Sequence, residues 1–296
     1  MSTFYTHEEK NTWKTFFLML VFIGMIVGIG WFLSYQFQDS SILYIAIGAS
    51  VLMNFWAYWF SHKTVVRITG AKEASIQQYS ELHNLVENLA ITAGLPKPKV
   101  YVIEDQSPNA FATGRDKHHA IIAVSTGLLQ DLNRVELEGV IAHELAHIGN
   151  NDMLLSTMAV VFVGVLTMIA DLFIYSGSSR SEGNNQGAGI IGMLVIVILM
   201  PIIGTLLRMA ISRKREFLAD ASAVRLTRYP DGLASALQKI SDSSYQLRQA
   251  PESAAHLFIS DPKRKTSKAS MLKKLFSTHP PIEKRITALR SMGGTV

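Results

Sequence analysis

The sequence predicts an α-rich membrane protein with four transmembrane helices and a cytoplasmic part of mixed α+β structure. Three observations indicate this fold class: long uncharged apolar segments, an asymmetric distribution of lysine and arginine around them, and short β-branched segments between helical ones. Hydrophobic residues make up 48% of the 296 residues and charged residues only 17%. Such a composition is too apolar for an ordinary soluble domain of this length and is typical of a membrane protein.

Four segments are long enough and apolar enough to cross a lipid bilayer, which takes roughly 20 residues of helix. None of them contains a charged residue. They divide the chain into a membrane hairpin (1–60), a polar segment (61–152), a second membrane hairpin (153–207) and a C-terminal polar segment (208–296). The predicted spans are Thr15–Leu33, Ile42–Phe60, Met153–Ala170 and Gly189–Leu207.

Lysine and arginine are concentrated before the first span and in the two polar segments. The loop between the first two spans has none, and the loop between the last two has only Arg180. Because positively charged flanks stay on the cytoplasmic side, both termini and both polar segments are expected in the cytoplasm. The net charge of +5 then fits a partner with anionic headgroups, the lipid bilayer, and no motif indicates binding to nucleic acid.

The polar segment 61–152 is predicted to contain two helices and a small sheet. Apolar residues recur at helical spacing over Glu73–Ala93, and Gly94 ends this pattern. Three short segments rich in β-branched and aromatic residues follow and predict about three strands. A second helix is expected over Arg134–Asn150. The predicted strand segments read KVYVIED, NAFATGR and HHAIIAVSTG.

The second of these helices carries the motif His-Glu-x-x-His. His143 and His147 are four residues apart, so both imidazoles lie on one helix face and can bind one metal ion. Because the chain has no cysteine, any zinc must be held by histidine and carboxylate. Glu144 lies beside the two histidines without being a ligand, and the motif therefore predicts a zinc site with Glu144 as general base.

A zinc ion bound by two histidines needs at least one more protein ligand. Glu216 and Asp220 are four residues apart on an expected helix after the fourth span, and like charges at this spacing repel unless a cation lies near them. We take Glu216 as the candidate third ligand and expect Asp220 to accept the ring N–H of a ligating histidine. The spacing alone also fits a juxtamembrane helix in which Arg213 pairs with Glu216.

Two further stretches carry candidate substrate-binding residues. Asn109 opens NAFATG and could bond the backbone of an extended substrate, or it could cap a turn before the strand. As an edge strand, NAFATG could itself pair with a substrate backbone whatever its side chains are. His279 and Arg285, in THPPIEKR, could donate to the oxyanion of peptide hydrolysis, and the alternative is a C-terminal turn with a helix-starting proline and a solvated arginine.

Taken together, these motifs resemble those of the HtpX family of membrane zinc metalloproteases, distant relatives of the CAAX prenyl protease. The resemblance covers nearly the whole chain and implies a zincin-like metalloprotease domain. It also implies that zinc is held by His143, His147 and Glu216, with Glu144 as general base. The stretches that carry it are PNAFATGR (108–115), HELAHIGNND (143–152), SRKREFLADASAV (212–224) and STHPPIEKRI (277–286).

The expected function is that of a zinc-dependent endopeptidase whose active site faces the cytoplasm. Because the motif directly precedes the third span, the metal is expected close to the bilayer surface, where membrane proteins or unfolded polypeptides are the expected substrates. The resemblance implies a bacterial inner membrane and a role in protein quality control. The alternative is a zinc-binding membrane sensor or scaffold that keeps the ligands without hydrolysing anything.

Overall fold

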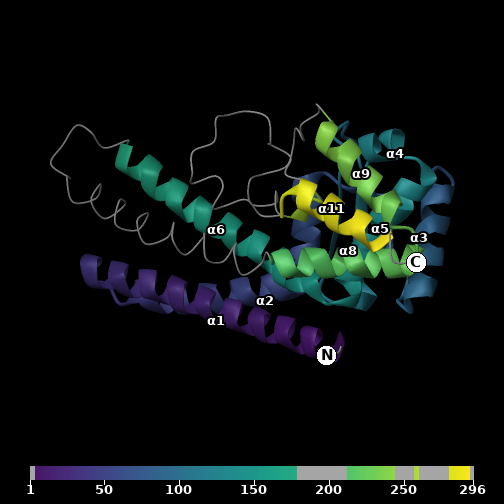
Figure 1. Ribbon diagram of the computed structural model, residues 1–296. Helices are drawn as coiled ribbons and strands as arrows, with labels where there is room; N and C mark the ends of the chain where they lie inside the picture. The colour runs from purple at the N-terminus through teal and green to yellow at the C-terminus, as the bar shows by residue number, and fades with distance from the viewer. Residues whose placement is uncertain (1–3, 179–211, 244–256, 260–279, 294–296) are drawn as a thin grey trace.

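The computed structural model describes residues 4–178, 212–243, 257–259 and 280–293. This portion of the chain has two parts, which Figure 1 shows. One consists of three long helices, and the other of shorter helices around a small sheet. The long helices extend away from the shorter elements, as the ribbon shows. The predicted fourth span, Gly189–Leu207, and the candidate residue His279 lie outside the described residues.

The three long helices contain three of the four predicted spans. They are α1 (Phe4–Phe37), α2 (Ser41–Thr69) and α6 (Asp152–Ser178). Each pair of them is in contact, and buried apolar residues such as Phe22 and Phe162, whose rings stack 4.0 Å apart, fill the space between them. The stretches long and apolar enough to cross a membrane are Asn11–Phe37, Ser41–Thr69 and Asp152–Asp171.

The outer faces of α1 and α2 are unusually apolar. A soluble protein rarely leaves many large apolar side chains of neighbouring helices in water, whereas lipid contact stabilises such a surface. The two helices therefore have the surface that a membrane requires. The side chains exposed by more than half include Trp13, Leu20, Trp31, Leu52 and Trp56.

A four-stranded mixed sheet has the strand order β1-β2-β4-β3. β2 and β4 pair in parallel, whereas β1 and β3 pair antiparallel with β2 and β4, so β3 lies at one edge. The three predicted strands are confirmed, and the prediction that NAFATG forms an edge strand is confirmed as well. The strands are β1 (Lys72–Glu73), β2 (Lys99–Ile103), β3 (Ala110–Gly114) and β4 (Ala120–Ser125).

The first predicted helix, Glu73–Ala93, begins later than expected. α3 covers Ser80–Ala93, and the start predicted at Glu73 is wrong. Glu73 belongs to β1 and pairs with Tyr101, and the next residue donates its backbone N–H to the carbonyl of Val100 at 2.9 Å. The sheet therefore takes the backbone groups that a longer helix would have needed. The predicted end is correct, because Gly94 adopts a left-handed φ of 67°.

Helix α5 (Arg134–Gly149) confirms the second predicted helix and lies at the centre of the shorter elements. It starts with a reciprocal capping box between Asn133 and Glu136. Gly139 allows close packing against α9 (Pro230–Asp242), because a Cβ there would lie 2.8 Å from the backbone nitrogen of Leu233. α5 also packs against the sheet, α3 and α8 (Arg213–Thr227).

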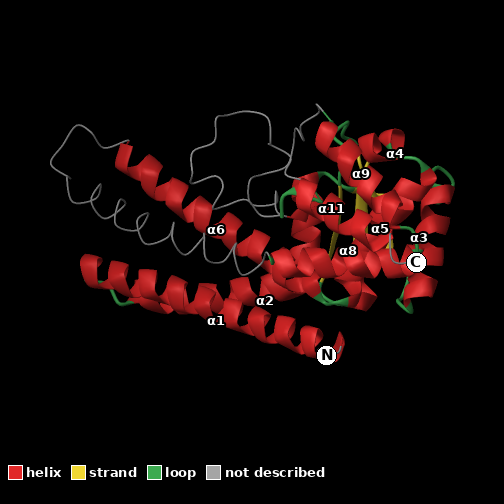
Figure 2. Cartoon of the chain, viewed as in Figure 1, coloured by secondary structure: helices red, strands yellow, loops and turns green. Residues whose placement is uncertain are grey.

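The remaining helices complete a buried core around α5. Figure 2 shows the strands within this helical part, away from the far ends of the long helices. One apolar cluster joins the sheet to the surrounding helices, and a second one joins α2, β3 and α6. The first cluster holds α5 against the sheet and includes Met153 of α6, and the second one holds the sheet against α2 and α6. The other helices are α4 (Thr126–Asp131), α8 (Arg213–Thr227), α11 (Ile282–Gly293) and the 3-10 turn η1 (Lys117–His119).

Candidate metal centre

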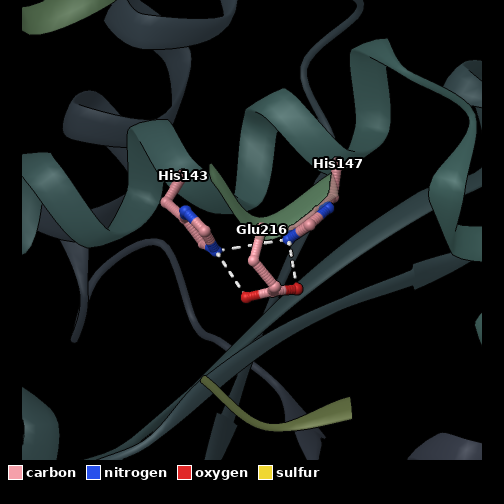
Figure 3. Close-up of side chains that lie close together, drawn as sticks. All are labelled: His143, His147 and Glu216. Carbon is pink, nitrogen blue, oxygen red and sulfur yellow. Dashed lines mark hydrogen bonds and ion pairs between the residues drawn. The ribbon is translucent and has the colours of Figure 1, made fainter. Parts of the chain in front are cut away.

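Three side chains from two helices converge on one point, as Figure 3 shows. His143 and His147 lie in the second half of α5, and Glu216 reaches them from α8. The Nε2 atoms of the two histidines are 3.2 Å apart. Glu216 Oε2 lies 3.8 Å from His143 Nε2, and Glu216 Oε1 lies 3.6 Å from His147 Nε2.

These three donors fit a divalent metal ion such as zinc. In a tetrahedral site with bonds of about 2.0–2.1 Å, neighbouring ligand atoms lie roughly 3.3 Å apart, close to the separations between these side chains. One atom from each of the three residues lies within 4.8 Å of the others. Two imidazole nitrogens facing each other also repel unless a proton or a metal ion lies between them. A metal ion between the two rings would remove this repulsion.

Each histidine has a carboxylate behind it. Asp220 Oδ1 lies 3.0 Å from His143 Nδ1, and Asp152 Oδ2 lies 3.2 Å from His147 Nδ1. A carboxylate in this position can accept the Nδ1–H, which would leave the lone pair of Nε2 available to bind a metal ion. The predicted contact between Asp220 and a histidine of the motif is thus present in the structure, on His143.

Asp152 is the site residue that sequence reasoning missed. It is the first residue of α6, and its Oδ1 also accepts hydrogen bonds from Asn11 Nδ2 at 2.7 Å and Arg215 Nη1 at 3.3 Å. The sequence does contain a signal for it. An acidic residue at the start of an apolar span, five positions after His147, needs partners if it is buried.

The surroundings of His147 are strongly acidic. Burial by itself would lower the pKa of His147, but its hydrogen bond to Asp152 and the negative charges of Glu216, Asp152 and Glu144 outweigh this and raise the pKa to about 9. A site that favours the cationic form of a histidine so strongly also favours a metal cation at the same place.

Glu144 is buried beside the two histidines and lines the same cavity. Burial raises the pKa of its carboxyl, and the charge of Glu216 raises it further, while the nearby cationic groups offset part of the effect. A carboxylate whose pKa is raised is a better proton acceptor at neutral pH. Glu144 therefore combines the position and the basicity that a general base needs.

Arg285, on α11, is fully buried and joins the two acidic residues of α8. Its Nε and Nη2 donate to the two carboxylate oxygens of Asp220 at 2.9 and 2.6 Å, and its Nη1 lies 3.4 Å from Glu216 Oε2. Burial opposes ionisation of Asp220, but Arg285 and the hydrogen bond with His143 lower the pKa of Asp220 to about 2. The alternative interpretation of Arg285 as a solvated residue is wrong.

The three candidate metal ligands line a cavity of about 50 Å³ that reaches the edge strand β3. Ala112 is the β3 residue at its wall. Beside it, Ile259 donates its backbone N–H to the carbonyl of Ala110 at 3.1 Å, and the ring of Phe258 packs edge-on against Phe111. The apolar residues of the wall are Ala112, Met153, Leu257 and Ile259, and none of them is aromatic. The cavity is lined by Ala112, His143, Glu144, His147, Asp152, Met153, Ser156, Glu216, Leu257 and Ile259.

Asn109 lies at the start of β3, next to this wall. Its side-chain oxygen accepts the backbone N–H of Ala110 at 3.1 Å, and its carbonyl accepts the backbone N–H of Ser125 at 2.9 Å. These are the contacts of a residue that begins a strand. A contact between Asn109 and a substrate backbone stays a prediction, as does the role of His279.

Comparison with known proteins agrees with this geometry. The chain matches the family model of peptidase family M48 over residues 77–293. It is 43% identical over 296 residues to the protease HtpX homolog of Dictyoglomus turgidum, covering 98% of this chain and 95% of that protein. It is 40% identical over 293 residues to the protease HtpX homolog of Streptococcus gordonii, covering 95% of this chain and 97% of that protein.

A solved structure supports the fold. The crystal structure of S. mikatae Ste24p superposes with a TM-score of 0.50 at 19% sequence identity, covering 92% of this chain and 62% of that one. The family match spans α3 to α11 and includes all three candidate metal ligands. The chain therefore belongs to peptidase family M48, and within that family it is a member of the HtpX proteases.

Proposed function

We propose that this protein is a zinc-dependent endopeptidase that hydrolyses peptide bonds of membrane or misfolded proteins on the cytoplasmic side of a bacterial inner membrane. One observation carries the proposal: His143, His147 and Glu216 converge beside the buried Glu144 in a cavity that reaches a sheet edge. A purely structural metal site would have no use for a buried glutamate next to its ligands. The proposal is tested by cleavage of an unfolded protein such as casein.

The chemistry is divided between the metal and Glu144. Zinc bound by these ligands supplies Lewis-acid activation of water and of the scissile carbonyl. Glu144 takes the proton of the attacking water and later returns it to the leaving amine. Asp220 and Asp152 hold the two imidazoles in the required tautomer while this happens. The acidic surroundings thus serve both the metal and the proton transfer.

The developing oxyanion needs a donor besides the metal, and we assign this role to Arg285, with His279 as the second candidate. Nη1 of Arg285 is buried and has no hydrogen-bond partner among the described residues. Because Nε and Nη2 are occupied by Asp220, the guanidinium is held with Nη1 turned toward the site. Such a fixed donor is what stabilisation of a transient negative charge requires.

An extended substrate is proposed to pair with the outer edge of β3. Backbone groups alternate in direction along an antiparallel strand, and Asn109 bonds inward to β4. The backbone N–H and C=O groups of Ala110 and Ala112 therefore point outward, away from β4. Because the carbonyl of Ala110 already accepts the N–H of Ile259, Ala112 is the next outward position, and it lines the cavity. Main-chain pairing here would favour broad specificity.

The size of the cavity at Ala112 leads to a prediction. Replacing Ala112 by valine adds two methyl groups to the wall, and we expect kcat/KM for peptide cleavage to fall by roughly tenfold to a hundredfold. Zinc content should stay at the wild-type level because Ala112 is not a ligand. Ala112→Ser, which changes the volume little, is the control and should keep most of the activity. Unchanged kinetics of the valine variant would contradict substrate binding at this position.

The membrane setting is proposed from the distribution of charges and from the candidate spans. The termini and the segments 61–152 and 208–296 lie in the cytoplasm, and the hairpins 1–60 and 153–207 cross the bilayer with four helices. The metal site then lies at the bilayer surface, because α6 begins only five residues after His147. This position favours membrane proteins and their cytoplasmic segments as substrates, and protein quality control as the setting.

Because the chain has no cysteine, its topology can be tested with single introduced cysteines. In intact spheroplasts, a membrane-impermeant maleimide should label Ser40→Cys, in the loop after α1, and Ser181→Cys, in the loop before the proposed fourth span. It should label Glu104→Cys, exposed after β2, only once the membrane is permeabilised. Labelling of Glu104→Cys in sealed spheroplasts would overturn the orientation, and protection of Ser181→Cys would overturn the second hairpin.

A further inference from the structure

We propose that Asn11 and Asp152 form a positioning pair through which the first membrane helix orients the metal ligand His147. This inference rests on the proposed function and assigns a new role to α1. Asp152 is buried, and its two carboxylate oxygens face different partners. Oδ2 is 3.2 Å from His147 Nδ1, and Oδ1 accepts a hydrogen bond of 2.7 Å from Asn11 Nδ2.

The contact made by Asn11 is well defined. Asn11 is buried, and its Nδ2 also donates to the carbonyl of Asn150 at 3.1 Å. Asn150 is the C-cap of α5, and Asp152 is the first residue of α6. One amide group of α1 therefore bridges the end of the helix that carries both histidines and the start of the helix that follows it.

This bridge lies at the boundary between the membrane helices and the metal centre. Asn11 is the first residue of the candidate membrane span in α1, and the rest of that span packs against α2 and α6 (Figure 1). A buried polar side chain at this place is costly unless its hydrogen bonds are made, and the two acceptors that satisfy Asn11 belong to the chain around the site. α1 thus both anchors the protein in the membrane and, through Asp152, supports the metal ligand His147.

Arg215 contacts the same carboxylate oxygen of Asp152 as Asn11 does. Its Nη1 lies 3.3 Å from Asp152 Oδ1, and it immediately precedes Glu216 in α8. Asp152 consequently connects His147 with the helix of the third ligand and with the first membrane helix. If Asn11 is lost, one hydrogen bond that fixes the orientation of Asp152 is lost, and the His147 ring becomes less restricted.

The experiment uses the full-length protein purified in detergent and measures the metal directly. Zinc dissociation is followed with an excess of chelator, and the ligand geometry with the visible spectrum of the cobalt-substituted protein. We expect Asp152→Asn to accelerate zinc loss by about tenfold to a hundredfold and Asn11→Ala by about tenfold, with altered cobalt bands in both. Neither readout requires the protein to cleave anything.

The matched control is Asn54→Ala, which removes a buried asparagine from α2 whose Nδ2 bonds Ser50 within the same helix. It should leave zinc dissociation and the cobalt spectrum unchanged. A general loosening of the membrane helices would instead affect all three variants alike, and this result would overturn the proposal.

A double variant tests whether the two residues act on His147 together. Asn11→Ala combined with Asp152→Asn should lose zinc no faster than Asp152→Asn alone, because Asn11 acts through the carboxylate. The proposal would be overturned if the two substitutions had additive effects on the rate of zinc dissociation, or if Asn11→Ala lost zinc at the wild-type rate. If wild type holds zinc tightly and never cleaves casein, the proposed function fails, while the dissociation rates still decide the role of Asn11.

Discussion

Replacing Glu144 by glutamine is expected to abolish casein cleavage while the protein keeps its zinc. Glutamine has nearly the same shape as glutamate but cannot take a proton from the attacking water, so the rate should fall by roughly a hundredfold to ten-thousandfold. Glu144 lies beside His143 in the sequence but is not among the three converging ligand groups, so zinc content should not change. Cleavage is followed by release of labelled peptides, and zinc by elemental analysis of the same sample.

The control for this experiment is Glu104→Gln, an exposed glutamate paired with Lys72 at the surface. It should cleave casein at the wild-type rate. A Glu144→Gln protein that remains active would remove Glu144 as general base. A wild-type protein that is fully loaded with zinc and never cleaves casein would instead favour the alternative function. In that alternative the protein is a membrane sensor or scaffold that binds zinc and hydrolyses nothing.

Replacing Glu216 by alanine is expected to release the zinc. The site would keep only two imidazoles, and two protein ligands bind zinc far more weakly than three do. Changes to residues behind the ligands already cost about tenfold to a hundredfold in affinity, so loss of a ligand itself should cost more than about a hundredfold. Competition against a chromophoric chelator measures this affinity, and casein cleavage should be lost in parallel.

The matched control is Glu81→Ala, which removes an exposed glutamate in the first turn of α3. It should bind zinc as tightly as wild type. Equal zinc affinity of the Glu216 and Glu81 variants would remove Glu216 from the site and would revive the interpretation in which Glu216 pairs locally with Arg213.

The parts of this site that lie on one helix could be predicted from the sequence. The distance from His143 to His147 is fixed by the helical period, and Glu144 follows from the motif. Glu216 depends on packing between α5 and α8, so its spacing alone could not exclude an ion pair with Arg213. The spacing made Glu216 the candidate third ligand, and the family resemblance strengthened this assignment.

Contacts between distant segments account for what sequence reasoning missed. The sequence left Arg285 either as an oxyanion donor or as a solvated residue, because its partner Asp220 is 65 residues away in the chain. Asp152 was missed because its roles depend on Asn11 and Arg215, which come from two other helices. The start of the first predicted helix was wrong because Glu73 belongs to β1. This strand has only two residues, too few to show an alternating pattern in the sequence.

The candidate metal ligands come from α5 and α8, which precede and follow the segment 153–207 in the sequence, and this has a consequence for biosynthesis. A nascent chain carries both histidines long before Glu216 and Arg285 have been translated. Until α8 packs against α5 and α11 packs against α8 and α9, the unfinished protein therefore lacks the Glu216 carboxylate and the Arg285 guanidinium. If the proposed function holds, the complete site assembles only after α8 and α11 have been translated, and a nascent chain that stops before them is expected to be inactive as a protease.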